Sequence, residues 1–501
     1  MIPQSSKCSA ATLAALCAAL AAAIALRAPP PPPLPPLAAP SSAPAEPRAR
    51  LRDARVLVIS HDASASGAPR VCVEMAQALA GLGAAVSLAV QGRAVVRRTD
   101  REALVSLLGG GAAAFAVVGL TPREVRDADF VIVSTAVASN SAWIAAAAAM
   151  PPVPPPSRMA GVVDALLDLA AIATGASRTS ARHVRPNARL VWLVHESGAV
   201  MRALGRAATD AAVTAMSDPR GRVDSVVFVS HAARAWWLEE VQRQHASAAA
   251  LRPSLVLHWG IPRWKLELLA SPDRAAEARV RLRRQLGFDE ADFVFLVVGS
   301  FHPMKGHAGI VRAFLDAQAA CPRGDAAVGR RRLVAVGGGL GAADYFPREF
   351  ADVESVLALS DVRLLPSTSD VAAYFAMADV AVSNTQGPGE TWGLATLEAL
   401  AAGKAVLAAG NGGTLEQLQH NETALLHPGS DAGSGDASAA LSERPRHLFA
   451  DVAAPSELVR HMCAVATDTD LFFRLRAAGS AHVRRALSQD HIDSVLTAML
   501  A

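Results

Sequence analysis

The chain has 501 residues, which is enough for two domains with separate hydrophobic cores. Its 48 Lys and Arg against 45 Asp and Glu leave a net charge of +3, and the sequence contains no dense basic run with interleaved aromatic residues. We therefore expect no nucleic-acid partner. The five cysteines are scattered and form no Cys-x-x-Cys pair, so the sequence indicates neither a zinc site nor a disulfide framework.

The first 50 residues are expected to lie outside the globular domains. Ser9 to Leu26 carries no charge and approaches the length of a bilayer span, and a proline tract from Pro29 to Pro36 follows it. Residues 1–50 are interpreted as a signal anchor and a proline-rich stalk. This predicts a membrane contact through the N-terminal segment, in a single-pass type II protein of the Golgi or another endomembrane. A cleaved signal or transit peptide is the alternative, which would give a secreted or plastid protein.

The globular part begins with the pattern of a doubly wound domain. Residues 55–60 form a short apolar run, typical of a buried parallel strand. A small-residue loop through Gly67 leads into an amphipathic helix that is expected to end near Gly81, and residues 85–90 give the next strand. The dinucleotide fingerprint Gly-x-Gly-x-x-Gly is missing, which argues against a nicotinamide enzyme.

Three later strands are expected in this domain, and two of them are each followed by a histidine. Residues 130–134 and 190–194 are apolar runs, and the second leads directly into His195. Side chains at the carboxyl end of a parallel strand point toward a ligand cleft, so His195 is a candidate contact to a substrate. A further strand at 226–230 precedes His231, which is interpreted as a helix cap or a surface residue.

A second strand–loop–helix unit starts near residue 293. The expected strand at 293–299 continues into a loop that contains Ser300, Lys305 and Gly306, and a helix follows. Further strands of this domain are expected at residues 333–337, 362–366, 378–383 and 405–409.

The most informative segment runs from Gly387 to Lys404. Glu390 lies in a Gly/Pro turn, and Glu398 follows eight positions later in a helix-forming run. Eight residues of helix rise about 12 Å, whereas two carboxylates that share one glycosidic bond are about 5 to 9.5 Å apart. The start of a helix between them attracts phosphate. The segment therefore predicts a cradle for a nucleotide sugar, and an ordinary strand–loop–helix with two surface glutamates is the alternative.

This segment resembles the Glu-x7-Glu signature of the retaining glycosyltransferases of family four, and further matches extend from about Val56 to Pro428. The resemblance implies the α/β fold called GT-B, with two Rossmann-like doubly wound domains facing a cleft. Residues 51–265 would form the N-terminal acceptor domain and residues 266–480 the nucleotide-sugar-binding domain. Residues 481–501 would form a C-terminal helix that packs back across the cleft.

The resemblance also implies roles for individual residues. In the catalytic group, Glu390 would contact the transferred sugar, His195 the sugar or the acceptor, and Lys305 the diphosphate. In the donor-binding group, Glu398 would bind the ribose, and Ser300 stands where the family has an arginine. The rest of the donor-binding group consists of backbone contacts at Gly67, Trp392, Gly393 and Leu394. No metal ion and no cofactor beyond the nucleotide-sugar co-substrate are expected.

These observations predict a metal-independent, retaining, hexosyl-type glycosyltransferase. It would move a sugar from a UDP- or GDP-linked donor to an acceptor that the sequence does not identify, whether glycan, lipid or protein. A non-catalytic binding or scaffold protein on the GT-B fold is the first alternative, and the serine at position 300 is the feature that favours it. A GT-B sugar-nucleotide epimerase is the second.

Overall fold

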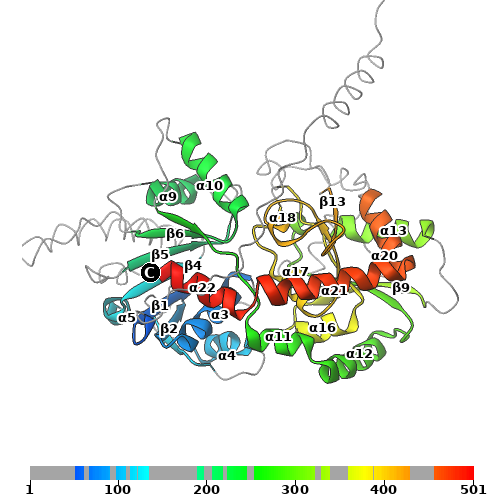
Figure 1. The fold of residues 1–501 in the computed structure, drawn as a ribbon, viewed down its shortest axis with the longest axis horizontal. Coiled ribbons are helices and arrows are strands. Elements are labelled where there is room, and N and C mark those ends of the chain that lie inside the picture. Colours follow the sequence, from blue (N-terminus) through cyan, green and yellow to red (C-terminus); the bar gives the residue numbers. More distant parts are fainter. Residues whose placement is uncertain are drawn as a thin grey trace, which may run out of the picture. The chain divides into compact units, whose positions relative to one another are not determined.

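A computed structural model gives the fold of the protein, and Figure 1 labels many of its helices and strands. The structure describes residues 51–60, 67–90, 97–108, 113–120, 122–134, 189–196, 206–217, 223–244, 253–321, 329–338, 359–387, 389–428 and 456–500.

The first half of the described chain forms a parallel sheet of seven strands in the order β3-β2-β1-β4-β5-β6-β7. Its strands are rich in Val, Ile and Leu and are buried along most of their length, as expected when helices cover both faces of a parallel sheet. The strands are β1 (Arg55–Ser60), β2 (Ala85–Val90), β3 (Ala116–Gly119), β4 (Phe130–Ser134), β5 (Arg189–Val194), β6 (Ser225–Phe228) and β7 (Ser254–Val256).

Helices alternate with these strands along the chain. Helix α3 packs on β1 and β2, and α10 packs on β6. The largest side chains of this core are Trp192 on β5, Phe228 on β6 and Trp237 on α10, all fully buried. The described helices of this half are α3 (Gly67–Gly81), α4 (Arg98–Ser106), α5 (Pro122–Asp127), α9 (Arg206–Ser217) and α10 (His231–Gln244).

The second half forms another parallel sheet, with six described strands in the order β10-β9-β8-β11-β12-β13. It has its own apolar core, in which Phe295 of β8 meets Phe314 of the following helix in an edge-to-face contact. The strands are β8 (Phe293–Val298), β9 (Arg331–Gly337), β10 (Val362–Pro366), β11 (Val380–Ser383), β12 (Ala405–Ala409) and β13 (Leu425–His427).

The described helices around the second sheet follow the same alternating pattern. Helix α12 ends at Gly287, whose positive φ of 71° gives the left-handed cap that glycine favours. These helices are α11 (Arg263–Ala270), α12 (Pro272–Leu286), the 3₁₀ turn η2 (Pro303–Lys305), α13 (His307–Ala320), α16 (Val371–Met377), α17 (Leu394–Ala401), α18 (Thr414–Gln417), α20 (Ser456–Thr467), α21 (Thr469–Ala486) and α22 (Gln489–Leu500).

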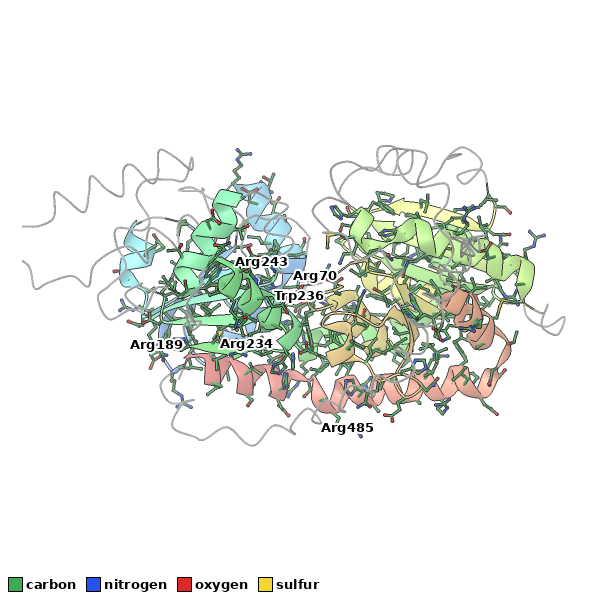
Figure 2. All side chains as sticks on the ribbon, turned by 90° about the horizontal axis from the view of Figure 1, so that it is seen from above. Arg70, Arg189, Arg234, Trp236, Arg243 and Arg485 are labelled. Carbon is green, nitrogen blue, oxygen red and sulfur yellow. A yellow bond between two sulfur atoms is a disulfide. The ribbon has the colours of Figure 1, made fainter. Side chains whose placement is uncertain are left out.

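The last two helices contact elements of both sheets. Helix α21 packs against α17 and β12, whereas α22 packs against α3. Arg189 of β5, labelled in Figure 2, donates a hydrogen bond from Nη1 to the carbonyl of Leu500 at 3.3 Å. The carbonyl of Leu487 accepts from the backbone N–H of Ile261, and a Cβ at the neighbouring Gly260 would lie 2.4 Å from that oxygen. Only glycine fits this crossing.

A disulfide joins Cys321, at the end of α13, to Cys463 of α20, with 5.2 Å between the Cα atoms. The expectation that the cysteines form no disulfide was therefore wrong for this pair. The two cysteines are 142 residues apart in the sequence, and only the packing of α13 on α20 brings them together. Cysteine spacing carries no sign of such a pairing.

Two buried histidines make the stability of the fold depend on pH. Burial, with the nearby charge of Lys305, lowers the pKa of His307 from 6.5 to about 3, and burial beside His461 lowers the pKa of His427 to about 4. The unfolded chain takes up these protons from about pH 6.5 downward, whereas the folded chain does not. We therefore expect the unfolding free energy to fall as the pH drops below 6.5, by up to about 1.4 kcal/mol per pH unit for each histidine.

Urea denaturation between pH 7 and pH 4.5 measures this dependence, and His307→Gln should flatten it. His427→Gln should flatten it as well, because burial also lowers the pKa of His427. Parallel curves for the wild type and His307→Gln would contradict the assignment to His307.

Candidate functional site

The strand order of each sheet reverses at one pair of neighbouring strands. In the first sheet this pair is β1 and β4, and in the second it is β8 and β11. Ligands of open α/β sheets bind outside the carboxyl ends of the strands at such a reversal. The segments that follow these four strands are therefore where a site is expected.

A cavity of ≈ 710 Å³ lies at these strand ends. The structure places eight of the nine predicted site residues on its wall: His195, Ser300, Lys305, Glu390, Trp392, Gly393, Leu394 and Glu398. The ninth, Gly67, begins α3, and its neighbours Ala68 and Arg70 line the cavity instead. The placement brings the predicted residues together, and their individual roles stay predictions.

Lys305 and Glu390 form an ion pair on the cavity wall. Lys305 ends the turn after β8, Glu390 lies between β11 and α17, and the lysine Nζ contacts the Oε2 atom of the glutamate. Two glycines set the backbone on either side. A Cβ at Gly306 would lie 2.2 Å from a backbone oxygen, and one at Gly389 would lie 2.5 Å from the Oδ1 of Asn411. Both glycines have positive φ, so larger residues would move the pair.

Helix α17 begins directly beside this pair. Its N-cap is Gly393, and among the described residues no side chain caps the helix start. Trp392 is buried, and its Nε1 donates to the carbonyl of Trp259 at 2.8 Å, which fixes the turn before the helix. The first N–H groups of α17 and the positive end of its dipole therefore face an anion-binding position.

Glu398, on the same helix, lies in a buried group of charges. Its Oε1 contacts Lys265 of α11 at 2.5 Å and Arg70 of α3 at 3.0 Å. Lys265 also contacts Glu74 of α3, and the Nε1 of Trp259 donates to Glu74 at 2.8 Å. We call these five residues the Glu398 cluster.

The Glu398 cluster changes how this glutamate is understood. Burial alone would raise the pKa of Glu398, but the charges of Lys265 and Arg70 outweigh it and lower that pKa. The carboxylate is 2 % exposed, and its Oε1 is occupied by the two cations. The motif spacing predicted a ligand contact for Glu398 and missed this structural role. Arg70, labelled in Figure 2, Glu74 and Lys265 carry no sequence pattern that would have identified them.

His195 follows β5, and its Nε2 lies 2.9 Å from the Oγ of Ser134, the last residue of β4. Because β4 and β5 are parallel neighbours, both side chains reach the same edge of the sheet. The carbonyl of Glu196 accepts from the Nε1 of the buried Trp237. This bond holds the backbone after β5, so the histidine has a fixed position on the cavity wall.

Ser300 is exposed on the cavity wall and offers no charge. His302 does not replace the missing cation, because burial and the charge of Lys305 lower its pKa, which leaves it neutral near pH 7. Arg70 is the guanidinium on the wall, and its side chain is 15 % exposed. The cavity wall therefore carries a second cationic side chain, Arg70 of α3, in addition to Lys305.

Two parallel doubly wound sheets with the ligand cavity at their strand ends define the GT-B architecture, as the sequence predicted. Solved structures share the fold at low sequence identity. HepE from Anabaena, solved in complex with UDP-glucose, is 16% identical with a TM-score of 0.58, covering 89% of this chain and 99% of that one. Sucrose-phosphate synthase from Thermosynechococcus elongatus is 16% identical with a TM-score of 0.56, covering 88% and 96%.

Residues 279–445 match the family model of the glycosyl transferases group 1. D-inositol 3-phosphate glycosyltransferase from Salinispora tropica is 34% identical over 166 residues, which cover 32% of this chain and 33% of that protein. The same enzyme from Geodermatophilus obscurus is 32% identical over 200 residues, covering 38% and 43%. The match to the Salinispora enzyme thus spans about a third of that relative's length. The resemblance to the retaining glycosyltransferases of family four is confirmed over this segment.

The predicted Golgi location was wrong. The matching relatives come from bacteria such as Salinispora, which have no Golgi, so the type II signal-anchor interpretation is not supported. Within the part of the chain that the structure describes, no helix is both long enough and apolar enough to cross a bilayer. The segment from Ser9 to Leu26 and the proline tract lie outside the described residues.

Proposed function

We propose that the protein is a retaining glycosyltransferase that uses a nucleotide-diphosphate sugar. The observation that carries this proposal is the Lys305–Glu390 ion pair beside the start of α17, at the carboxyl ends of β8 and β11. A cation and a helix N-terminus suit a diphosphate, and an adjacent carboxylate suits the hydroxyl groups of a sugar. The UDP-glucose complex of HepE supports a UDP-linked donor, and a GDP-linked donor is the second choice.

In this proposal the ion pair separates when the donor binds. The diphosphate takes the contact with Lys305, and Glu390 then accepts hydrogen bonds from the transferred sugar. Charge builds up on the diphosphate as the sugar–phosphate bond breaks, so Lys305 and the N–H groups at Trp392, Gly393 and Leu394 stabilise the transition state more than the ground state. Arg70 supplies the second cation in place of the arginine that Ser300 replaces.

Retention follows from attack on the face that the diphosphate leaves. The acceptor oxygen bonds to the anomeric carbon while the carbon–oxygen bond to phosphate breaks, and the departing phosphate oxygen takes the acceptor proton. No protein nucleophile is needed. The ion pairs of Glu398 with Lys265 and Arg70 support this route, since a paired carboxylate is a poor nucleophile.

The two sheets divide the substrates in this proposal. Residues 51–265 hold the acceptor, with His195 at the transferred sugar, and residues 266–480 hold the donor. The ribose contact of Glu398 uses Oε2, because Oε1 already faces two cations. The small residues that begin α3 at Gly67 let the donor approach the backbone there.

The test is a donor screen with the purified protein and UDP- and GDP-linked hexoses, with water as the acceptor. We expect release of nucleotide and of free sugar that initially has the anomeric configuration of the donor, because the incoming oxygen uses the leaving-group face. Proton NMR of the anomeric signal, recorded before mutarotation, reports the configuration.

The other outcomes of this screen identify the alternatives. An inverted sugar would refute the retaining route. Thermal stabilisation by a donor without turnover would indicate the non-catalytic binding protein. Conversion of the donor sugar to a stereoisomer that stays attached to the nucleotide would indicate the epimerase.

A further inference from the structure

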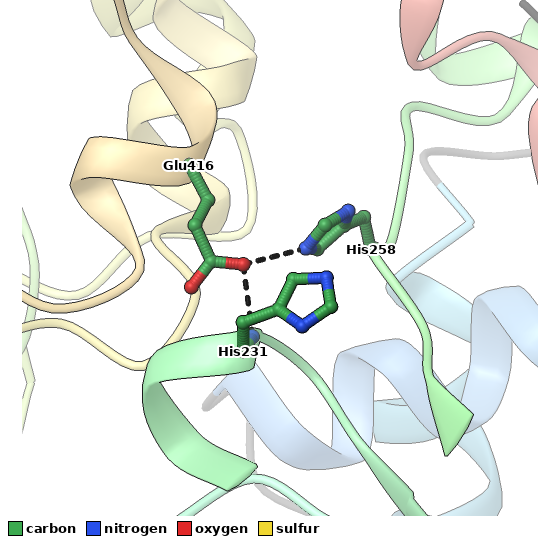
Figure 3. A group of neighbouring side chains, drawn as sticks. All are labelled: His231, His258 and Glu416. Atoms are coloured by element: carbon green, nitrogen blue, oxygen red, sulfur yellow. Dashed lines mark hydrogen bonds and ion pairs between the residues drawn. The ribbon is translucent and has the colours of Figure 1, made fainter. Parts of the chain in front are cut away.

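Three side chains with metal-binding atoms converge from distant parts of the chain (Figure 3). His231 begins α10 beside the first sheet, His258 follows β7, and Glu416 belongs to α18 beside the second sheet. One ligand atom from each lies within 4.8 Å of the other two. We call these three residues the His-His-Glu group. None of them is among the described residues that line the cavity, so the group is separate from the donor site.

The carboxylate of this group is held in place from two sides. The backbone N–H groups of His231 and Ala232 each donate to Glu416 at 2.8 Å, so the glutamate caps helix α10. The Nε2 of His258 lies 2.7 Å from its Oε2 atom (Figure 3). A carboxylate has about four acceptor positions, and a metal ion would take the one that His258 now occupies.

Charge and exposure also suit a cation. The backbone N–H groups of His231 and Ala232 point at the two oxygens of the Glu416 carboxylate and so favour its anionic form, which a cation requires. The carboxylate is 7 % exposed, which limits solvent screening on one side. His231 is exposed, which leaves a path for the ion and a water ligand.

We propose that His231, His258 and Glu416 bind a divalent transition-metal ion, with Zn²⁺ the best match. Two imidazoles and one carboxylate form a three-ligand zinc set whose fourth position is open to water. Mg²⁺ and Ca²⁺ prefer oxygen ligands throughout and fit this set poorly. In the metal-free protein the Nε2–H of His258 donates to Glu416; when the ion binds, this proton is lost to solvent, the ring keeps its proton on Nδ1, and the Nε2 lone pair binds the metal.

The ion would tie the first sheet to the second. Its ligands come from the start of α10, from the segment after β7 and from α18, so binding stabilises the contact between these elements. His258 also stacks on Trp392 with 4.6 Å between ring centroids. Trp392 precedes α17, so the ion would hold the donor-binding turn in place without taking part in sugar transfer.

The test measures Zn²⁺ binding to the full chain by isothermal titration calorimetry at pH 7.5, with Co²⁺ absorption as a second readout. We expect one ion per chain, and a loss of affinity of at least about tenfold in each of His231→Ala, His258→Gln and Glu416→Gln. His231→Ala is the sharpest variant. Residue 231 donates its hydrogen bond to Glu416 from the backbone N–H, so Glu416 still caps α10 when the imidazole is removed.

His420→Ala is the matched control, because this histidine is exposed beside the second sheet and lies outside the group. Circular dichroism reports whether each variant is folded. If His258→Gln or Glu416→Gln does not fold, the result for His231→Ala decides the test. Absence of Zn²⁺ binding to the wild type would overturn the proposal. Undiminished binding in His231→Ala, or an equal loss in His420→Ala, would do the same.

Discussion

Replacing Glu390 by Gln is expected to lower donor turnover by about 100-fold or more while the fold stays intact. The amide keeps the size of the carboxylate, and Thr385, whose Oγ1 lies 3.5 Å from Oε2, can still donate to it. The substitution removes the negative charge of the carboxylate that accepts hydrogen bonds from the hydroxyl groups of the transferred sugar. Lys305 also loses its partner in the free protein, so its contact with the diphosphate should not weaken.

Steady-state kinetics with the best donor of the screen should therefore show a large fall in kcat with little change in KM. Glu422→Gln is the control, since this exposed glutamate lies in the turn between α18 and β13 and is not among the described residues that line the cavity. Unchanged turnover in Glu390→Gln would remove this residue from the reaction, and with it the assignment of the ion pair as the centre of the site.

The elements that place the site were predictable because they depend on local sequence. Apolar runs such as residues 55–60 and 293–298 are strands, and each continues into a loop and a helix as the spacing indicated. Parallel strands put their carboxyl ends at one edge. The positions of His195, Lys305 and Glu390 on one cavity wall follow from that rule and from the family resemblance.

The partners of these residues were not predictable, because they come from tertiary packing. Glu398 contacts Arg70, which is 328 residues away in the sequence, and Glu416 contacts His258, which is 158 residues away. Neither pair has a spacing that a motif could record. Lysine, arginine and glutamate are mostly solvent-exposed, so their burial in pairs is visible only once the helices are packed.

Ser300, which stands where the family has an arginine, is another case in which the sequence alone does not show what tertiary packing supplies. The sequence shows that the family's arginine is missing from the loop after β8, and this feature supported the non-catalytic alternative to the predicted glycosyltransferase. In the structure, Arg70 of α3 and Lys305 both line the cavity, so another element places a guanidinium on its wall. The charge of a site is a property of the folded surface, so one altered position in a motif is weak evidence against catalysis.

Replacing Lys265 by Met is expected to destabilise the protein by about 3 to 5 kcal/mol, because breaking a buried ion pair leaves an uncompensated charge. Lys265 is 7 % exposed and contacts both Glu74 and Glu398, which are 1 % and 2 % exposed. Without the lysine, Glu398 keeps its contact with Arg70, whereas Glu74 loses the ion pair with Lys265. Urea denaturation followed by tryptophan fluorescence measures the loss, since Trp259 belongs to the cluster.

A double substitution separates the charge from the packing. Lys265→Met with Glu74→Gln removes one charge of each sign and keeps an oxygen that accepts from Trp259, so we expect it to recover much of the lost stability. The exposed pair of Arg98 and Glu102 is the control, and Arg98→Met should change stability by no more than about 0.5 kcal/mol. A Lys265→Met variant as stable as the wild type would mean that the Glu398 cluster is hydrated in solution.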